Sequence, residues 1–357
     1  MTGGQPCSAC LGRSRTLARL SPYLDRAGRG ADRLVALLGL SDSRLAQLAG
    51  READGGDPGA ELGRCRRAGL TAICRHQDLY PARLRGLDAA PAVLYCTAPG
   101  GRLGDALAGP TMAIVGTRSA SALGLETARA LGRGLSAAGV TVISGMALGI
   151  DAAAHAGALE APGHTVAVLA GGAERAHPVV HLGLYRRIAE RSCVVSEALA
   201  GEAPRRWRFV ARNRLIAGLA DAVIVVEAPP RSGALLTARW ARELGRPLGA
   251  VPGPVSAPRA AGVNALVRSG AELIRDAEDA LELVCGIGGR RVPSPEAPAE
   301  LPGLLGRLLA AVAEGAATPS ELVESGIAPD EVLAGLAELE LRGAVRRTLS
   351  GTYLPAL

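Results

Sequence analysis

Residues 112–118 read Met-Ala-Ile-Val-Gly-Thr-Arg, an apolar run that passes directly into a loop of one glycine and two polar residues. A short apolar run closed by glycine is typical of a strand that is buried on both faces of a parallel sheet. Six similar runs follow, separated by stretches with helical spacing, at residues 140–143, 165–169, 193–196, 222–226, 248–251 and 273–274. This alternation predicts the α/β class, with a doubly wound parallel sheet that has helices on both faces.

Residues 1–75 precede this pattern and are rich in Leu, Ala and Arg at helical spacing, which predicts a small N-terminal helical domain. A short helix is expected near residues 61–68. After it we expect an irregular connector up to residue 110, because no further periodic pattern is evident there. We place the sheet domain at residues 76–285.

Residues 286–300 are rich in Gly and Pro without an apolar period, so we expect a linker. Residues 301–357 predict three helices and a hairpin, at 301–314, from 318 onward, at 329–342 and at 344–354. That order is typical of a winged-helix-like domain, with a generic α+β module as the alternative. The third expected helix is too acidic to suit a DNA groove, so we weigh protein contact equally with DNA contact.

The composition excludes several classes of protein. The 357 residues carry 40 basic and 34 acidic side chains, a formal net charge of +6, and every basic side chain is an arginine. Without lysine, neither a Walker A phosphate loop nor Schiff-base chemistry is available. The apolar runs are far shorter than the ~20 residues that span a bilayer, and residues 1–10 lack the pattern of an export signal. We therefore expect a cytoplasmic protein without a membrane partner.

Seven cysteines in a chain without an export signal indicate reduced thiols rather than a disulfide framework. Cys7 and Cys10 form a CxxC pair, which is half of a common zinc pattern. The other cysteines are scattered singly, and no second CxxC or HxxxH follows. We therefore expect an incidental pair and no metal, with a zinc site as the alternative.

Histidine patterns and cofactor motifs give weaker signals. His155 lies four residues after Asp151 on an expected helix, so the two form either a catalytic dyad or, as we expect, a structural contact. His177 and His181 are also four apart, but the Pro after His177 indicates a turn and a third metal ligand is missing. Gly116 lacks the continuation of a dinucleotide fingerprint. We expect no catalytic residues, no metal and no cofactor.

Small and polar residues follow the expected strands. In an open parallel sheet, ligands bind at the carboxyl ends of the strands, where glycine lets backbone N–H groups approach an anion. Tight turns also need glycine for steric reasons, which is the alternative for any single loop. Several such loops together, with an arginine in the first, favour a phosphate site. The candidate binding residues in these loops are Gly116, Thr117, Arg118, Ser144, Gly145, Gly171, Ser232 and Gly233.

The densest cationic segment is residues 204–214, Pro-Arg-Arg-Trp-Arg-Phe-Val-Ala-Arg-Asn-Arg, with five arginines, no acid and the only phenylalanine of the chain. Guanidinium groups pair with phosphates and aromatic faces stack on unpaired bases, so this mixture is typical of a track for single-stranded nucleic acid. The alternative is a solvated basic loop that Trp207 and Phe209 anchor in the core. We expect a helix to begin at Asn213 and Arg214.

Motifs along residues 80–285 carry a family resemblance. They are residues 113–118, 144–151, 209–219, 226–228, 231–238, 251–253 and 270–271. In this collinear set the chain resembles the DNA-processing protein DprA (Smf) family. Carried over position by position, the DNA-contacting residues of the family correspond to Arg118, Arg206, Phe209, Arg212, Asn213 and Arg214.

The resemblance implies a protein that binds and protects single-stranded DNA and assists loading of the RecA recombinase in natural transformation or homologous recombination. It implies an extended Rossmann-like sheet domain that forms a homodimer, an N-terminal domain similar to SAM modules, and a C-terminal winged-helix-like domain. Apolar helix surface within residues 222–283 is the expected two-fold interface. Its examples are Leu235, Leu236, Trp240 and Leu244.

The chain departs from the family at three positions. His177 and His181 stand where the family has Tyr and Asn, and Val210 stands where it has Pro. The competing function is a Rossmann-type enzyme that splits nucleoside monophosphates and whose glycine-rich loop supplies a catalytic Glu. Residues 231–237 carry no Glu, so we expect a binding protein and not an enzyme.

Overall fold

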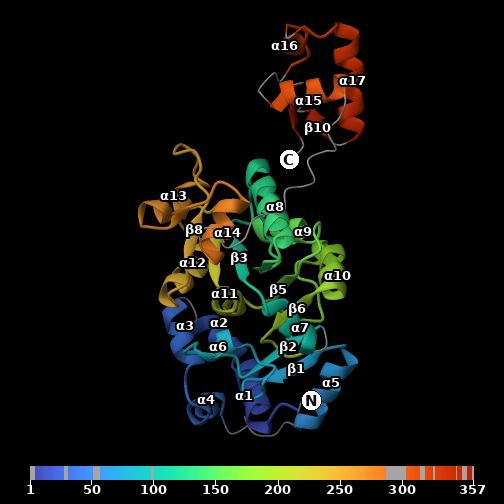
Figure 1. The fold of residues 1–357 in the computed structure, drawn as a ribbon. Helices are drawn as coiled ribbons and strands as arrows, with labels where there is room; N and C mark the ends of the chain where they lie inside the picture. Colours follow the sequence, from blue (N-terminus) through green and yellow to red (C-terminus); the bar gives the residue numbers. More distant parts are fainter. Residues whose placement is uncertain are drawn as a thin grey trace. The chain divides into compact units, whose positions relative to one another are not determined.

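The computed structural model describes residues 5–27, 31–50, 57–97, 100–286, 303–313, 318–324, 326–342, 344–347 and 352–355. The chain divides into two compact units, Met1–Val292 and Pro293–Leu357. The first unit holds the sheet and the N-terminal helices, and the second holds the small C-terminal fold (Figure 1).

The first unit is built on a nine-stranded sheet with the order β1-β2-β6-β5-β4-β3-β7-β8-β9. Strands β3 to β9 are parallel to one another, and the seven runs read from the sequence as strands are confirmed. The strands are β1 Thr71–Cys74, β2 Val93–Cys96, β3 Thr111–Val115, β4 Thr141–Ser144, β5 Thr165–Leu169, β6 Cys193–Ser196, β7 Ala222–Val225, β8 Leu248–Ala250 and β9 Glu272–Leu273.

The expectation of an irregular connector up to residue 110 is wrong. Strand β2 pairs antiparallel with β6, and β1 pairs antiparallel with β2, so this segment extends one edge of the sheet. All four residues of β2 are buried, which the apolar run Val-Leu-Tyr-Cys allows. The expected domain boundary after residue 75 therefore falls between two strands that pair with each other.

Side chains of successive strand residues point to opposite faces of the sheet, and helices cover both faces. Along β3, Met112 and Ile114 pack with α8, α9 and α14, whereas Ala113 and Val115 pack with α6, α7, α11, α12 and α13. The helices are α6 Ala82–Arg85, α7 Gly100–Leu107, α8 Ala122–Ala137, α9 Ile150–Ala158, α10 Leu182–Arg191, α11 Arg206–Leu219, α12 Ala234–Glu243, α13 Ala261–Arg268 and α14 Ala277–Cys285.

The N-terminal helices pack in two places, on α11 and on strands β1 and β2. They are α1 Ser8–Arg19, α2 Ser21–Ala27, α3 Ala31–Leu38, α4 Asp42–Ala49 and α5 Pro58–Arg67. Leucines of α2, α3 and α4 surround Trp207 and Ala211 of α11, and α1 and α5 share a second core with β1 and β2. These helices belong to the same compact unit as the sheet.

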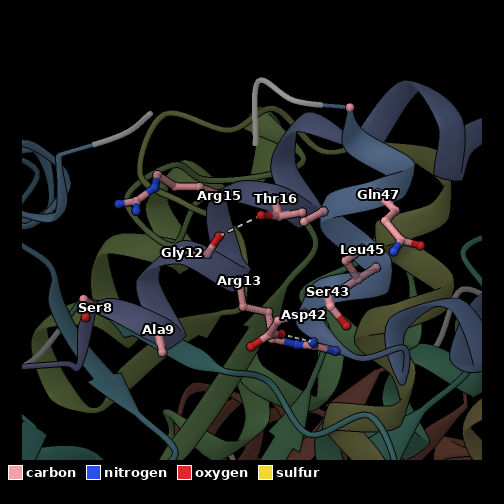
Figure 2. A pocket seen from close by; sticks show the side chains of 12 residues that line it. Ser8, Ala9, Gly12, Arg13, Arg15, Thr16, Asp42, Ser43, Leu45 and Gln47 are labelled. Carbon is pink, nitrogen blue, oxygen red and sulfur yellow. Dashed lines mark hydrogen bonds and ion pairs between the residues drawn. The ribbon is translucent and has the colours of Figure 1, made fainter. Parts of the chain in front are cut away.

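A cavity of about 930 Å³ lies between α1 and α4. Figure 2 shows Arg13 and Asp42, which form an ion pair across this gap, and the bond from Thr16 Oγ1 to the Gly12 carbonyl. None of the residues predicted to bind DNA lines the cavity. The predicted DNA-binding residues therefore lie away from this cavity.

The second unit contains three helices and a two-stranded hairpin, in the predicted order. Its elements are α15 Leu304–Ala313, α16 Pro319–Glu324, α17 Pro329–Leu341, β10 Val345–Arg347 and β11 Tyr353–Pro355. Leu308, Leu322, Leu336 and Leu339 form the centre of its core. Residues 287–300 of the expected linker and Gly343 lie outside the described residues. In the part of the chain that is described, we find no helix with the length and apolarity needed to cross a bilayer.

Candidate nucleic-acid interface

A hollow of about 300 Å³ opens at the carboxyl end of β3, between α11 and the first turn of α12. It gathers residues that are up to 122 positions apart in the sequence, from Val115 to Thr237. Residues predicted to bind DNA that line it are Gly116, Thr117, Arg118, Phe209, Arg212, Asn213, Ser232 and Gly233. The fold therefore brings together predicted residues from two loops and one helix at a single place.

Arg118 and Phe209 form the rim of the hollow. The guanidinium carbon of Arg118 lies 5.1 Å from the centroid of the Phe209 ring, which is cation–π distance. The ring centroids of His177 and Phe209 are 5.7 Å apart at an interplanar angle of 51°. Arg118 is exposed, and none of the ion pairs found among the described residues includes it. Its charge and its donors are therefore available to a ligand.

Arg212 lies beneath the rim and is bound to the protein itself. Its side chain is buried, and Nη1 donates to the carbonyl oxygens of Gly145 at 2.6 Å and Val168 at 2.9 Å. A Cβ on residue 145 would lie 1.6 Å from this nitrogen, so glycine is required there for the guanidinium to fit. Arg212 thereby fixes the loop after β4 against the end of β5.

Asp151 is a buried carboxylate that, like Arg212, binds the backbone of Gly145. Burial raises the pKa of the Asp151 carboxyl, while the Arg212 guanidinium and backbone N–H groups act in the opposite direction. Its Oδ2 accepts hydrogen bonds from the N–H groups of Gly145 at 3.2 Å and Ala147 at 3.4 Å. Asp151 therefore organises the loop that precedes α9.

The last two residues of the basic segment also contact the protein. Arg214 is 2% exposed and forms an ion pair with Glu197, which follows β6. Asn213 Nδ2 donates to the carbonyl of Gly233 at 3.1 Å, and so joins α11 to the start of α12. Removal of either partner of a buried ion pair leaves an uncompensated charge, so Arg214 and Glu197 depend on each other.

The basic segment is a helix and not a loop, since α11 begins at Arg206 and not at Asn213. Helical geometry sends its side chains in different directions, so they do not form one continuous track. Arg208 is buried and pairs with Glu202 at 3.0 Å, while Arg205 pairs with Asp25 at 3.4 Å. Arg206 is exposed.

Trp207 is part of the core. Only 3% of the residue is exposed, and it packs among leucines of the N-terminal helices. The two aromatic residues of the segment therefore separate, with Trp207 inside and Phe209 half-buried at the rim. The alternative of an aromatic anchor is right for Trp207.

The remaining loop residues lie around the hollow with different contacts. Ser144 is fully buried, and its hydroxyl donates to the carbonyl of Ile114 at 2.6 Å. Gly171 approaches Pro204, because a Cβ there would lie 3.0 Å from the Pro204 nitrogen. Ser144 and Gly171 are not among the residues that line the hollow.

The N-termini of α8 and α12 differ in the groups that cap their backbone N–H groups. At α8, the Ser121 hydroxyl caps the Gly124 N–H at 3.0 Å, and Glu227 Oε2 accepts from the Ser121 N–H at 2.8 Å. This terminus thus already carries an anion of the protein. At α12, the Ala234 N–H donates to Ser232 Oγ at 3.3 Å, and Ser232, Gly233 and Ala234 line the hollow.

His155 has a structural role. Its Nδ1 lies 2.7 Å from Thr165 Oγ1, and burial lowers the pKa of the imidazole to about 3. The neutral ring joins α9 to β5, and Asp151 binds backbone N–H groups instead of His155. The expected structural contact is therefore to Thr165, and no Asp–His dyad forms.

The expectation that the CxxC pair lacks partners is wrong. Cys74 and His76 lie beside Cys7 and Cys10, with all four donor atoms within 4.8 Å of one another. The sequence pattern of a second CxxC does not reveal these partners, because they form a Cys-x-His pair that begins 64 residues after Cys10. His177 and His181 are not part of this group.

A mostly parallel doubly wound sheet joined to a three-helix and hairpin unit defines a Rossmann-like protein with a winged-helix domain. The chain belongs to the DNA recombination-mediator protein A family, whose model matches residues 71–285. The model of the DprA winged helix domain matches residues 292–349. The first match begins at β1, in agreement with the place of this strand in the sheet.

Relatives and solved structures agree with this membership. The chain is 46% identical over 268 residues to the putative DNA processing protein DprA of Mycobacterium tuberculosis, covering 73% of this chain and 68% of that protein. It is 36% identical over 217 residues to DNA processing protein DprA of Bacillus subtilis, covering 61% and 72%.

Two solved structures share the fold at a sequence identity above a quarter. DprA of Streptococcus pneumoniae superposes with a TM-score of 0.63 at 28% identity, covering 77% of this chain and 96% of that one. The DNA processing protein A of Helicobacter pylori superposes with a TM-score of 0.53 at 27% identity, covering 60% and 94%. The latter structure is described for its single-stranded DNA binding mode.

Proposed function

We propose that this protein binds single-stranded DNA at the hollow between α11 and α12. The observation that carries the proposal is the exposed Arg118 guanidinium beside the half-buried Phe209 ring. A guanidinium pairs with phosphate, and an aromatic face stacks on any base, so the pair serves a ligand whose bases are unpaired. The family and the single-stranded DNA binding of the Helicobacter pylori structure support the same ligand.

The predicted residues divide into two roles. Arg118, Phe209 and Arg206 are accessible, and we assign direct contact with DNA to them. Ser232 and Gly233 at the start of α12 offer a helix N-terminus to a phosphate. Gly116 and Thr117 line the hollow. The other predicted residues shape or support it through the contacts described above, and they are Ser144, Gly145, Gly171, Arg212, Asn213 and Arg214.

A hydrolase of nucleoside monophosphates is not favoured by the same hollow. Such chemistry needs a carboxylate directed at the substrate. Asp151 is the one carboxylate among the residues that line the hollow, and it is buried and holds two backbone N–H groups. The segment 231–237 contributes no Glu.

Binding is expected to be nearly independent of base sequence and strongly dependent on salt. Each arginine–phosphate contact with a single strand releases counterions, so the logarithm of affinity should fall by about 0.7 per contact for each tenfold rise in salt. Titrations of labelled single strands and of the matching duplex at several salt concentrations test this. Equal affinity for duplex and single strand, or binding that does not change with salt, would contradict the proposal.

Assembly as a homodimer is a further part of the proposed function, and it rests on the family. In the structure, Leu235, Trp240 and Leu244 are half-buried against the core of their own chain, and Leu236 lines the hollow. The expected interface on α12 is therefore partly covered already. Light scattering at micromolar concentration should give twice the mass of one chain, whereas the mass of a single chain would refute the dimer.

We infer that the protein acts in the cytoplasm, where it protects single strands and assists RecA in transformation or recombination. This step rests on the family of DNA recombination mediators. RecA should form filaments faster on strands coated with single-strand binding protein when this chain is present. An unchanged rate would remove RecA from the proposed partners and leave DNA binding untouched.

A further inference from the structure

Four metal-ligating side chains meet far from the hollow, where the N-terminus of α1 approaches the end of β1. Cys7 is the N-cap of α1, Cys10 lies in its first turn, Cys74 is the last residue of β1, and His76 follows two positions later. Their donor atoms all lie within 4.8 Å of one another. His76 Nδ1 is 3.3 Å from the Cys7 sulfur and 3.5 Å from the Cys10 sulfur.

Local backbone structure places these four donors. Residues three apart on a helix lie on the same side, so the first turn of α1 presents both cysteine sulfurs together. After β1 the chain turns back, because the Cys74 N–H donates to Gln77 Oε1 at 2.6 Å and the Gln77 N–H donates to the Cys74 carbonyl at 3.0 Å. This turn returns His76 to the same side as Cys74.

The ligand set matches one kind of metal. Three thiols and an imidazole are soft and borderline donors, which favour Zn²⁺ over hard cations such as Mg²⁺ or Ca²⁺. Tetrahedral Zn²⁺ with bonds of about 2.3 Å to sulfur and about 2.0 Å to nitrogen separates its ligand atoms by about 3.5 to 3.8 Å. The two distances from His76 Nδ1 to the cysteine sulfurs, 3.3 and 3.5 Å, are close to such separations, and all four donor atoms lie within 4.8 Å of one another.

We propose that Cys7, Cys10, Cys74 and His76 bind one structural Zn²⁺. Four protein ligands fill the tetrahedral shell and leave no position for a substrate. The N-terminus of α1 favours negative charge on the two sulfurs of its first turn. Arg75, between the other two ligands in the sequence, brings a positive charge near the site, which suits three thiolates around a divalent ion.

The CxxC pair has a third cysteine and a histidine beside it, which favours a metal site over a redox-active CxxC. A disulfide between Cys7 and Cys10 would need neither Cys74 nor His76. Cys65 provides a contrast, because it is buried in the same hydrophobic core as Cys10 and Cys74 and yet is not part of the group. The metal would join α1 to the edge strand of the sheet, and α1 in turn contacts α2 and α4.

Metal content of the full chain, purified without a histidine tag or chelator, is the first measurement. We expect one Zn²⁺ per chain, and loss of the metal in Cys10→Ser and Cys74→Ser. The matched controls are Cys65→Ser, which alters an equally buried cysteine, and Cys285→Ser, which alters a half-buried one. Both controls should keep the metal. His76→Cys should also keep it, because four cysteines bind Zn²⁺ as well.

If a cysteine variant fails to fold, the proposal can be tested by metal exchange on the unmodified protein. Chelator treatment under reducing conditions should lower the Tm, and added Co²⁺ should give the intense visible absorption and thiolate charge-transfer band of a tetrahedral sulfur site. A chain free of Zn²⁺ that takes up no Co²⁺ would overturn the proposal. So would a Cys7–Cys10 disulfide in the protein as purified, or Zn²⁺ that persists in both Cys10→Ser and Cys74→Ser.

Discussion

Replacement of Phe209 by alanine is expected to weaken binding of single-stranded DNA by ~1 to 3 kcal/mol and to leave the salt dependence unchanged. The reason is that the ring supplies a stacking surface at the rim of the hollow but no charge. Fluorescence anisotropy with a labelled oligonucleotide, repeated at several salt concentrations, measures both quantities. This prediction rests on the proposed function.

Arg118→Ala is the matched control, because Arg118 lies against the same ring. Loss of one arginine–phosphate contact should weaken binding and reduce the salt slope by about 0.7. The two variants must therefore differ in slope. If the folded Phe209→Ala protein binds normally and unfolds at a much lower temperature, the ring is a core residue and the stacking role is wrong.

Much of the sheet could be predicted because each central strand is a short apolar run between loops of small residues. β1 and β2 were missed because they pair antiparallel and have no repeating βα pattern beside them. What makes β2 a strand is its distant partner β6, which begins 97 residues after β2 ends. Pairing over such a separation cannot be read from local composition.

The sequence predicts which residues belong to the candidate site, but it does not predict which of them are exposed. The segment 204–214 contains no acid, so its arginines look unpaired along the chain. In the fold, Asp25 of α2 and Glu197, which follows β6, pair with two of them from other elements. Glu202, just before the segment, pairs with Arg208. Ion pairs between distant segments depend on tertiary packing, and so do the metal-ligating partners of the CxxC pair.

Trp207 joins the N-terminal helices to α11, so Trp207→Ala is expected to lower the free energy of unfolding by ~3 to 5 kcal/mol. The side chain fills a cluster that includes Leu24, Leu34 and Leu38, and its removal leaves a cavity that these leucines cannot fill. Urea unfolding followed by circular dichroism measures the loss. Limited proteolysis should then cut first within residues 5–50.

Two variants isolate the cause of this loss. Trp240→Ala removes the only other tryptophan, which is half-buried, so it should cost clearly less. In Trp207→Phe the aromatic filling remains, and no hydrogen bond is lost because the indole Nε1 has no partner among the described residues. Phe at 207 should therefore restore most of the stability. If Trp207→Ala is no less stable than Trp240→Ala, the N-terminal helices do not depend on this contact. In that case the sheet alone maintains the orientation of Arg206 and Phe209 on α11.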